Sequence, residues 1–142
     1  MGAKQKRRWL FIGSLILTAF WVAFIVSRSA KSASESSAES GWMLELVRKL
    51  IPGIGMHTLR KLAHFTEFAI LGVLLGLDCR YEGKSRWWAS LALGLAVASA
   101  DEYLQTFFSG RSGQLTDVLI DASGVLAALL FVKAIPKKKE RL

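Results

Sequence analysis

ADEYLQTFFSGRSGQLTDVLIDASG, residues 100–124, interrupts two long apolar runs with chargeable and amide side chains, among them Asp101, Glu102, Gln105, Arg111, Asp117 and Asp121. An ionised side chain in the middle of a membrane-spanning helix costs roughly 2.5 to 3.5 kcal/mol, so such residues persist mainly where they face a protein interior or serve a function. Asp101 and Gln105 are four residues apart, as are Asp117 and Asp121, and this spacing places each pair on one face of a helix. The stretch therefore predicts two helices whose polar faces flank a short loop carrying Arg111.

The composition around this stretch is typical of a membrane protein. The chain has 142 residues, 52% of them hydrophobic, and the apolar residues are gathered in blocks instead of alternating with polar ones. The net charge of +8 would suggest nucleic acid in a soluble protein, but the basic residues flank apolar blocks and no RNA-binding pattern accompanies them. The single cysteine, Cys79, excludes an internal disulfide. We expect one membrane domain over residues 1–142 and no nucleic-acid partner.

Four apolar segments are long enough to cross a bilayer, namely residues 9–26, 59–77, 87–104 and 116–135. The first reaches about 27 Å, close to the roughly 30 Å of hydrocarbon in a bilayer. Its basic start and the small residues after it also fit a cleaved signal peptide, but the run is longer than the 7 to 15 residues typical of a signal core and carries Trp9 and Trp21. The sequence thus predicts an all-α membrane protein with four transmembrane helices.

The segment between the first two spans divides into two parts. Residues 27–41 are rich in Ser, Ala and Glu and have too little apolar surface to order themselves, so we expect a flexible linker. Residues 42–51 place Trp42, Leu46 and Leu50 on one stripe of a short amphipathic helix that ends before Pro52. This helix is predicted either to lie flat at the bilayer surface or to pack on the bundle.

The distribution of Lys and Arg orients the chain. The start contributes four of these residues, the polar loop 78–86 three and the tail with Lys133 another five, so 12 of 19 lie on one side of the four-span arrangement. By the positive-inside rule that side is the cytoplasm. Both termini are therefore predicted to be cytoplasmic, and loops 27–57 and 105–115 to be extracytoplasmic.

This orientation brings the intramembrane polar residues to one depth. Lys61, His64 and Glu67 lie in the outer turns of the second span, and the acids of residues 100–124 lie at the outer ends of the third and fourth spans. Independent snorkelling residues would have no reason to occur only at outer ends, so the sequence predicts a single outward-facing pocket.

Small residues predict how the spans pack around that pocket. Gly72 and Gly76 in the second span, and Gly124 and Ala128 in the fourth, are typical of surfaces where helices approach closely. The first span has no chargeable side chain in residues 9–26, and we expect it to be peripheral.

The pocket residues have the chemistry for ligand binding and proton transfer. His64 with Asp101 or Glu102 is the candidate catalytic acid and base, and Arg111 with Lys61 is the candidate anion site. The other candidate ligand-binding residues are Glu67, Gln105, Asp117 and Asp121. Each has a structural alternative, since the helix dipole alone favours an acid in a first turn and an arginine can simply hold a loop down. We expect Arg111 to lie within hydrogen-bond reach of Asp101, Glu102 or Asp117, directly or through water.

The same side chains bear on metal binding. His64 with Asp101, Glu102 and Asp117 would supply nitrogen and oxygen ligands, but the sequence contains no dedicated metal spacing. We therefore predict neither a metal nor another cofactor.

Three strings within residues 60–130, KLAHFTEFAILG, ADEYLQ and SGRSGQLTDVLIDASG, resemble the VanZ-like family of small bacterial membrane proteins. That family's pattern is Lys-x-x-His-Phe-x-Glu, then Asp-Glu-x-x-Gln, then Gly-Arg followed by Asp-x-x-x-Asn-x-x-Gly. The resemblance points to Lys61, His64, Glu67, Asp101, Glu102, Gln105, Arg111, Asp117 and Gly124. The chain departs from the pattern at Asp121, where Asn is usual, and at Ala128, where Gly is usual. The resemblance implies a multi-pass protein of the bacterial cytoplasmic membrane with a link to the cell surface, since the family's namesake is associated with low-level teicoplanin resistance.

Three functional hypotheses follow, and the sequence leaves open whether the protein is an enzyme. The first is an outer pocket that binds, and in its stronger form modifies, an envelope component with a lipid-linked or phosphate-bearing head group. The second is a non-enzymatic scaffold or binding module of the envelope. The third is a small proton-coupled carrier, which the absence of polar residues in the inner halves of the spans disfavours. The expected partners are membrane lipid and a lipid-linked ligand, and the sequence predicts no oligomeric state.

Overall fold

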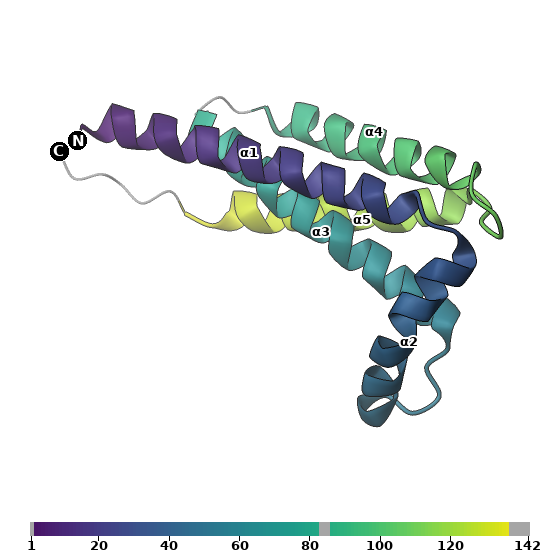
Figure 1. Cartoon of the computed structure of the whole chain (residues 1–142). Helices are drawn as coiled ribbons and strands as arrows, with labels where there is room; N and C mark the ends of the chain where they lie inside the picture. Colours follow the sequence, from purple (N-terminus) through teal and green to yellow (C-terminus); the bar gives the residue numbers. More distant parts are fainter. Residues whose placement is uncertain (1, 83–85, 137–142) are drawn as a thin grey trace.

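The computed structural model describes residues 2–82 and 86–136, and over these residues the chain is all-helical. Five helices follow one another: α1 (Ala3–Ser29), α2 (Ala33–Leu50), α3 (Met56–Glu82), α4 (Trp87–Gln105) and α5 (Leu115–Ala134). The helices α1, α3, α4 and α5 run side by side as a bundle, and α2 points away from one end of it (Figure 1). This arrangement confirms the predicted all-α class.

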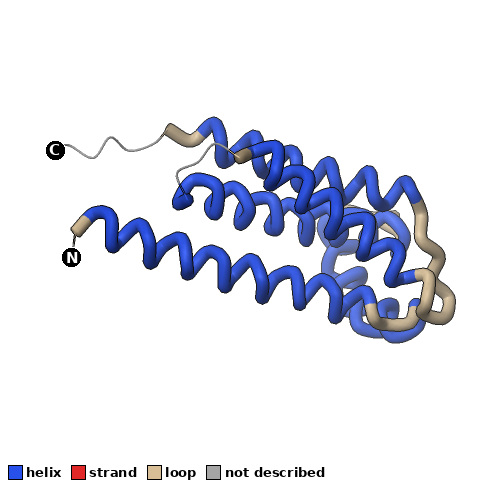
Figure 2. The backbone as a smooth tube through the Cα atoms, turned by 90° about the horizontal axis from the view of Figure 1, so that it is seen from above, coloured by secondary structure: helices blue, strands red, loops and turns tan. Residues whose placement is uncertain are grey.

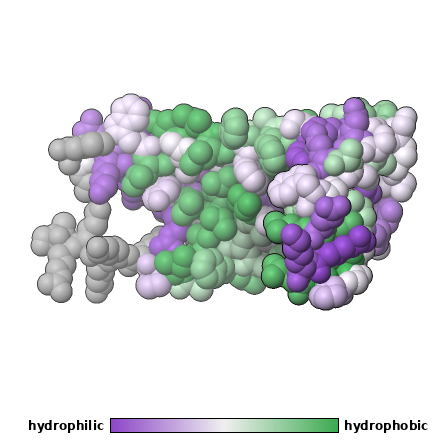
Figure 3. All heavy atoms as spheres, turned by 60° about the horizontal axis from the view of Figure 1, so that its bottom comes forward, coloured by the Kyte–Doolittle hydropathy of each residue, from purple (hydrophilic) through white to green (hydrophobic). Residues whose placement is uncertain are grey.

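Three of the bundle helices are long and apolar enough to cross a membrane, over residues Lys4–Ser29, Met56–Glu82 and Leu115–Ala134. The fourth, α4, is not among these three and carries Asp101, Glu102 and Gln105 in its last turns, yet it lies along the other bundle helices (Figure 1). Figure 2 shows the helices from above. Hydrophobic atoms cover the middle of the bundle, and hydrophilic atoms gather towards its ends (Figure 3). The structure thus supports a membrane protein, whereas the four-span arrangement and its orientation remain predictions.

The backbones of α3 and α5 approach one another closely at two glycines. A β-carbon on Gly72 would lie 2.6 Å from the carbonyl oxygen of Val125, and one on Gly124 would lie 2.5 Å from that of Phe65. A real β-carbon cannot occupy either position without moving a helix, because the obstacle is backbone. The interpretation of these residues as a close-packing surface is therefore confirmed.

The first helix lies on the outside of the bundle, as expected, since 17% of its span is buried inside the structure against 39% for α3 and 33% for α5. It nevertheless contributes to the site, which its lack of charge did not suggest. α1 packs against both α3 and α4, Ile25 is only 1% exposed, and the Trp21 Nε1 donates a hydrogen bond to the Glu67 carbonyl at 2.9 Å. The expectation used only the residues up to 26, but the last turn of the helix carries Arg28 and Ser29, which reach the polar cluster described below.

Residues 27–41 do not form a flexible linker. The chain is helical through Ser29 and again from Ala33, with a short turn between, and α2 is one helix that includes the predicted amphipathic segment. A capping box starts it: the Ser32 side chain accepts a hydrogen bond from the Glu35 N–H at 3.3 Å, and the Glu35 carboxylate accepts one from the Ser32 N–H at 2.8 Å. This Ser-x-x-Glu signal was present in the sequence, but the low apolar content of the segment obscured it.

The second half of α2 packs on one side and exposes an apolar stripe on the other. Leu44 lies in a small core with Ile54 and Leu59, whereas Trp42 is 65% exposed and Leu50 81% exposed. Part of the helix therefore rests on the start of α3, and its remaining apolar face is available to lipid.

The predicted polar loop 78–86 is shorter than expected. α3 continues through Glu82, residues 83–85 lie outside the described part of the chain, and Arg86 precedes α4. Asp78 lies inside the bundle, 9% exposed, and accepts a hydrogen bond from Thr18 at 2.8 Å. Not all buried acids therefore lie at the depth of the predicted pocket.

Two arginines bind helix C-termini at the end of the bundle where the chain begins and ends. Arg7 donates to the carbonyls of Tyr81 and Glu82, both at 2.8 Å, and Arg80 donates to those of Val132 at 2.7 Å and Ile135 at 2.8 Å. These carbonyls have no partner within the helix, so the arginines supply the missing hydrogen bonds. The rest of the basic tail, residues 137–142, lies outside the described residues.

The glycine contact predicts a difference between two Gly→Ala substitutions. Gly124→Ala should lower the free energy of unfolding by about 1 to 3 kcal/mol, because the added methyl group overpacks the α3–α5 contact. Gly13→Ala should leave it unchanged or raise it by up to about 1 kcal/mol, since nothing lies within 4 Å of its β-position and alanine is the better helix former. Unfolding of both variants in mixed micelles by SDS titration checks this, and equal stabilities would contradict the close contact.

Candidate functional site

Four ionisable side chains from three helices converge at the end of the bundle opposite the chain ends. His64 of α3, Asp101 and Glu102 of α4 and Asp121 of α5 each offer one atom, and these atoms all lie within 4.8 Å of one another. We call these four residues the acidic cluster. The His64 Nδ1 lies 3.4 Å from the Asp121 Oδ1 and 3.9 Å from the Asp101 Oδ2. The three acids are 0 to 4% exposed, so the carboxylates are removed from solvent.

Hydrogen bonds hold two of these acids in place, Asp101 through both carboxylate oxygens and Glu102 through one. Asp101 accepts from the Ser29 hydroxyl and, at 2.8 Å, from the Gln105 Nε2. The Glu102 Oε2 accepts from the backbone N–H of Gln114 at 2.9 Å, which ties α4 to the residue that precedes α5. Gln105, which was predicted as a ligand-binding residue, orients Asp101, and its role towards a ligand stays a prediction.

Other cluster atoms are buried without a hydrogen-bond partner among the described residues. They are the His64 Nδ1, the Glu102 Oε1 and both carboxylate oxygens of Asp121. Burying a polar atom without a partner costs about 1 to 3 kcal/mol, and more for a charged group. Apart from the 3.4 Å contact between the His64 Nδ1 and the Asp121 Oδ1, nothing in the described chain satisfies these atoms.

Two ion pairs flank the acidic cluster. The Lys61 Nζ lies 2.7 Å from the Asp117 Oδ1, and the Arg28 Nε lies 3.3 Å from the Glu67 Oε1. Each pair joins two helices, α3 to α5 in the first case and α1 to α3 in the second. The structure thus separates Asp117 from the acids with which the sequence grouped it.

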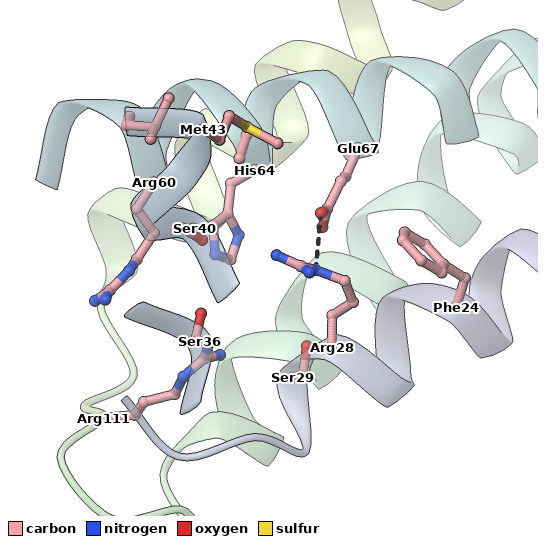
Figure 4. Close-up of a pocket in the computed structure, with 12 residues that line it drawn as sticks. Phe24, Arg28, Ser29, Ser36, Ser40, Met43, Arg60, His64, Glu67 and Arg111 are labelled. Atoms are coloured by element: carbon pink, nitrogen blue, oxygen red, sulfur yellow. Dashed lines mark ion pairs between the residues drawn. The ribbon is translucent and has the colours of Figure 1, made fainter. Parts of the chain in front are cut away.

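A cavity of about 200 Å³ opens beside the cluster. It is enclosed by α1, α2, α3 and the loop before α5, and Figure 4 shows His64 and Glu67 facing Arg28 across it. Ser36 and Ser40 of α2 also line it, although the sequence assigned their segment to a linker. A second cavity of about 130 Å³ shares several of its residues and is bounded by Lys61, Gln105 and Asp117.

Arg111 lines both cavities. The direct form of the contact predicted for it is wrong, and the form mediated by water stays a prediction. Among the described residues it forms no ion pair within 4.0 Å with Asp101, Glu102 or Asp117, and its Nε is buried without a hydrogen-bond partner. Burial, followed by the charge of the neighbouring Arg60, lowers the pKa of the Arg111 guanidinium from its ordinary value. An arginine remains protonated in proteins, so Arg111 is a partly desolvated cation facing the cavities.

The sequence missed the residues that α1 and α2 contribute to the site. Arg28 and Ser29 follow the last apolar residue of the first span, and only the position of α1 between α3 and α4 brings them to the cluster. The contribution of Gln114 is a backbone N–H, which no residue pattern could indicate.

The two classes of ion pair predict different coupling energies. A double-mutant cycle with Lys61→Met and Asp117→Asn should give a coupling energy of about 1 kcal/mol, because both side chains are mostly buried at 28% and 19% exposure. The cycle with Lys31→Met and Glu39→Gln, at a pair whose side chains are 35% and 46% exposed, should give a smaller coupling energy because solvent screens it. The free energy of unfolding in micelles measures both cycles, and a larger coupling for the exposed pair would contradict the assigned geometry.

Comparison with known proteins bears on the resemblance described above. A family model described as VanZ/LLP1 matches residues 14–136, a range that contains the acidic cluster, both ion pairs and Arg111. No curated protein and no solved structure matches the chain. Because the family model covers well over half of its length, the chain belongs to the VanZ/LLP1 family.

Proposed function

We propose that the cavities beside the acidic cluster bind the phosphate-bearing head group of a membrane lipid or lipid-linked envelope component. The observation that carries this proposal is the state of Arg111, a partly desolvated guanidinium whose Nε has no partner among the described residues. An unpaired buried donor is costly, and an anion entering the cavity would supply the acceptor. The planar fork of arginine matches the oxygens of a phosphate in particular.

The surroundings of Arg111 favour an anion over a neutral ligand. Arg60 lines both cavities and donates only to the Ser37 hydroxyl, at 3.1 Å, so its charge is not neutralised by an acid within ion-pairing distance among the described residues. Lys61 and Arg28 add positive charge, although Lys61 already contacts Asp117 and Arg28 contacts both Glu67 and Glu39. The cavities therefore combine two uncompensated cations with the hydroxyls of Ser36 and Ser40.

The position of His64 supports the stronger form of the proposal, in which the bound component is also modified. His64 lines both cavities and its Nδ1 faces Asp121, so one imidazole connects the ligand space with the buried acids. Such an imidazole can move a proton between a ligand and Asp101 or Glu102.

If the protein acts chemically, His64→Gln and Asp101→Asn abolish its phenotype at normal expression; a binding module tolerates both changes. Teicoplanin susceptibility is the phenotype that the family resemblance suggests.

A proton-coupled carrier remains the weakest of the three functions. Asp78 is a second buried acid, but the apolar side chains of Leu71, Leu75 and Leu129 lie in the core on the way to the cluster, exposed by 4% or less. A proton relay needs a chain of polar groups. Within the described residues, this layer interrupts any such chain.

The first test measures binding of phosphate head groups. Native mass spectrometry of the full chain in detergent should show phosphatidic acid retained in preference to phosphatidylcholine, with inorganic phosphate as a competitor that separates head-group from acyl-chain recognition. Arg111→Ala should weaken retention about 10- to 100-fold, the value of one charge-assisted hydrogen-bonding group. Arg111→Lys keeps the charge but loses the planar guanidinium, so its lipid retention should lie between those of the wild type and Arg111→Ala.

Lys49→Ala is the matched control for charge, because Lys49 is an exposed cation of α2 that lines neither cavity. If Lys49→Ala weakens retention as much as Arg111→Ala does, binding reflects general electrostatics and the proposed pocket is wrong.

The second test addresses the proposed location in the bacterial cytoplasmic membrane with the pocket facing outward. In a Cys79→Ser background, Ser112→Cys in the exposed loop before α5 should react with a membrane-impermeant maleimide in intact cells. Lys4→Cys at the other end of the bundle should react only after permeabilisation. The opposite labelling pattern would place the pocket on the cytoplasmic side.

A further inference from the structure

The acidic cluster carries more negative charge than its surroundings balance. Asp101, Glu102 and Asp121 are 3%, 4% and 0% exposed, and among the described residues no Lys or Arg lies within ion-pairing distance of any of them. A protonated His64 would neutralise one carboxylate of the three. Buried charges normally occur paired or bound to a metal, so two further positive charges are missing from this site.

The cations nearest the cluster are already engaged elsewhere. Lys61 pairs with Asp117 and Arg28 with Glu67, on the two sides of the cluster. Arg111 faces the cavities and makes no ion pair with the acids. Side chains of the described chain therefore do not supply the missing charge.

The orphaned atoms point to what does supply it. Asp121 is fully buried, and apart from the 3.4 Å contact of its Oδ1 with the His64 Nδ1 neither of its oxygens has a partner among the described residues. The Glu102 Oε1 has none either. The residues that carry these atoms, together with Asp101, each offer one ligand atom, and those four ligand atoms lie within 4.8 Å of one another. Two ligands on opposite sides of an ion with bonds of about 2.1 Å are about 4.2 Å apart, so small side-chain movements bring all four into coordination range.

We infer that His64, Asp101, Glu102 and Asp121 bind one divalent transition-metal cation, such as Mn²⁺ or Zn²⁺, between α3, α4 and α5. One imidazole nitrogen with three carboxylate oxygens is a donor set that suits these ions, whereas Mg²⁺ and Ca²⁺ prefer oxygen ligands alone. The ion supplies two positive charges, and together with a neutral imidazole it leaves the site with a single negative charge. The ion also satisfies the His64 Nδ1, the Glu102 Oε1 and one Asp121 oxygen. When Asp121 binds through a single oxygen, its other oxygen stays without a partner.

Groups around the cluster orient the ligands as in other metal sites. The Ser29 hydroxyl and the Gln105 amide hold the Asp101 carboxylate, and the Gln114 N–H holds the Glu102 Oε2 so that its Oε1 points inward. Such outer contacts fix the ligand positions and tune the affinity for the ion. Asp117, the fourth ligand considered from the sequence, is held by Lys61 and is replaced in the set by Asp121.

This inference goes beyond the proposed head-group binding and is tested without any phosphate. The full chain, purified in detergent and treated with EDTA, is titrated with Mn²⁺ and with Zn²⁺ by calorimetry. We expect one equivalent to bind, and Glu102→Gln and Asp121→Asn to weaken binding at least tenfold, because each keeps the side-chain volume and removes a charged ligand. Asp78→Asn, which changes a buried acid outside the cluster, should bind as the wild type does.

A measurement on the intact cluster covers the case in which these variants fail to fold. The chain has two histidines, and His57→Gln leaves His64 as the only imidazole. Electron spin-echo modulation of Mn²⁺ bound to this variant should show coupling to one histidine nitrogen, and Mg²⁺ should compete at least tenfold less effectively than Zn²⁺. The inference is overturned if wild type binds neither ion saturably, if the cluster variants bind as wild type does, if the nitrogen coupling is missing, or if Mg²⁺ competes equally. None of these results would affect the dependence of lipid retention on Arg111, so the two proposals fail separately.

Discussion

The near-contact of two backbones, α3 and α5, determines the geometry of the whole site. Helices can lie this close only where a side chain is reduced to hydrogen, as at Gly72 and Gly124. The second of these lies one turn beyond Asp121, against the carbonyl of Phe65, which is the neighbour of His64. Because a helix is stiff, fixing this crossing also fixes the distance between the imidazole and the carboxylate. In a membrane, where apolar surface drives helix association weakly, such close packing is a principal source of rigidity.

Around that crossing the site has two levels of opposite character. Deep in the bundle lie acids that lack counter-charges, and nearer the cavity mouths lie arginines that lack acids. The two groups do not neutralise one another directly. The nearest cations, Lys61 and Arg28, are paired with Asp117 and Glu67 instead. Separated opposite charges of this kind strengthen the local electric field in a medium of low dielectric constant. A ligand whose negative group contacts the arginines and whose other end reaches His64 would interact with both levels at once.

The sequence predicted those parts of the structure that depend on local pattern. Apolar blocks located the bundle helices to within a few residues, and the i, i+4 spacing of the acids placed Asp101 and Asp121 on facing surfaces. It failed where the outcome depends on tertiary packing. The distribution of charge said nothing of how α1 reaches the cluster, and polarity alone could not distinguish Asp117, which pairs with a lysine, from Asp121, which is fully buried. Low apolar content also hid the first half of α2, whose start is specified by hydrogen bonds of Ser32.

At the end of the bundle away from the acidic cluster, two arginines that contribute to the predicted orientation also stabilise helix ends. Positive charge near span ends is usually regarded as a label that insertion machinery and membrane potential act upon. Arg7 and Arg80, however, hold the terminal carbonyls of α3 and α5, each from a different helix. Reversing such charges to invert the chain would also unravel the last turns of two spans. In this bundle, therefore, two of the twelve basic residues from which the orientation is predicted also terminate helices, so replacing either one changes a helix end as well as the charge bias.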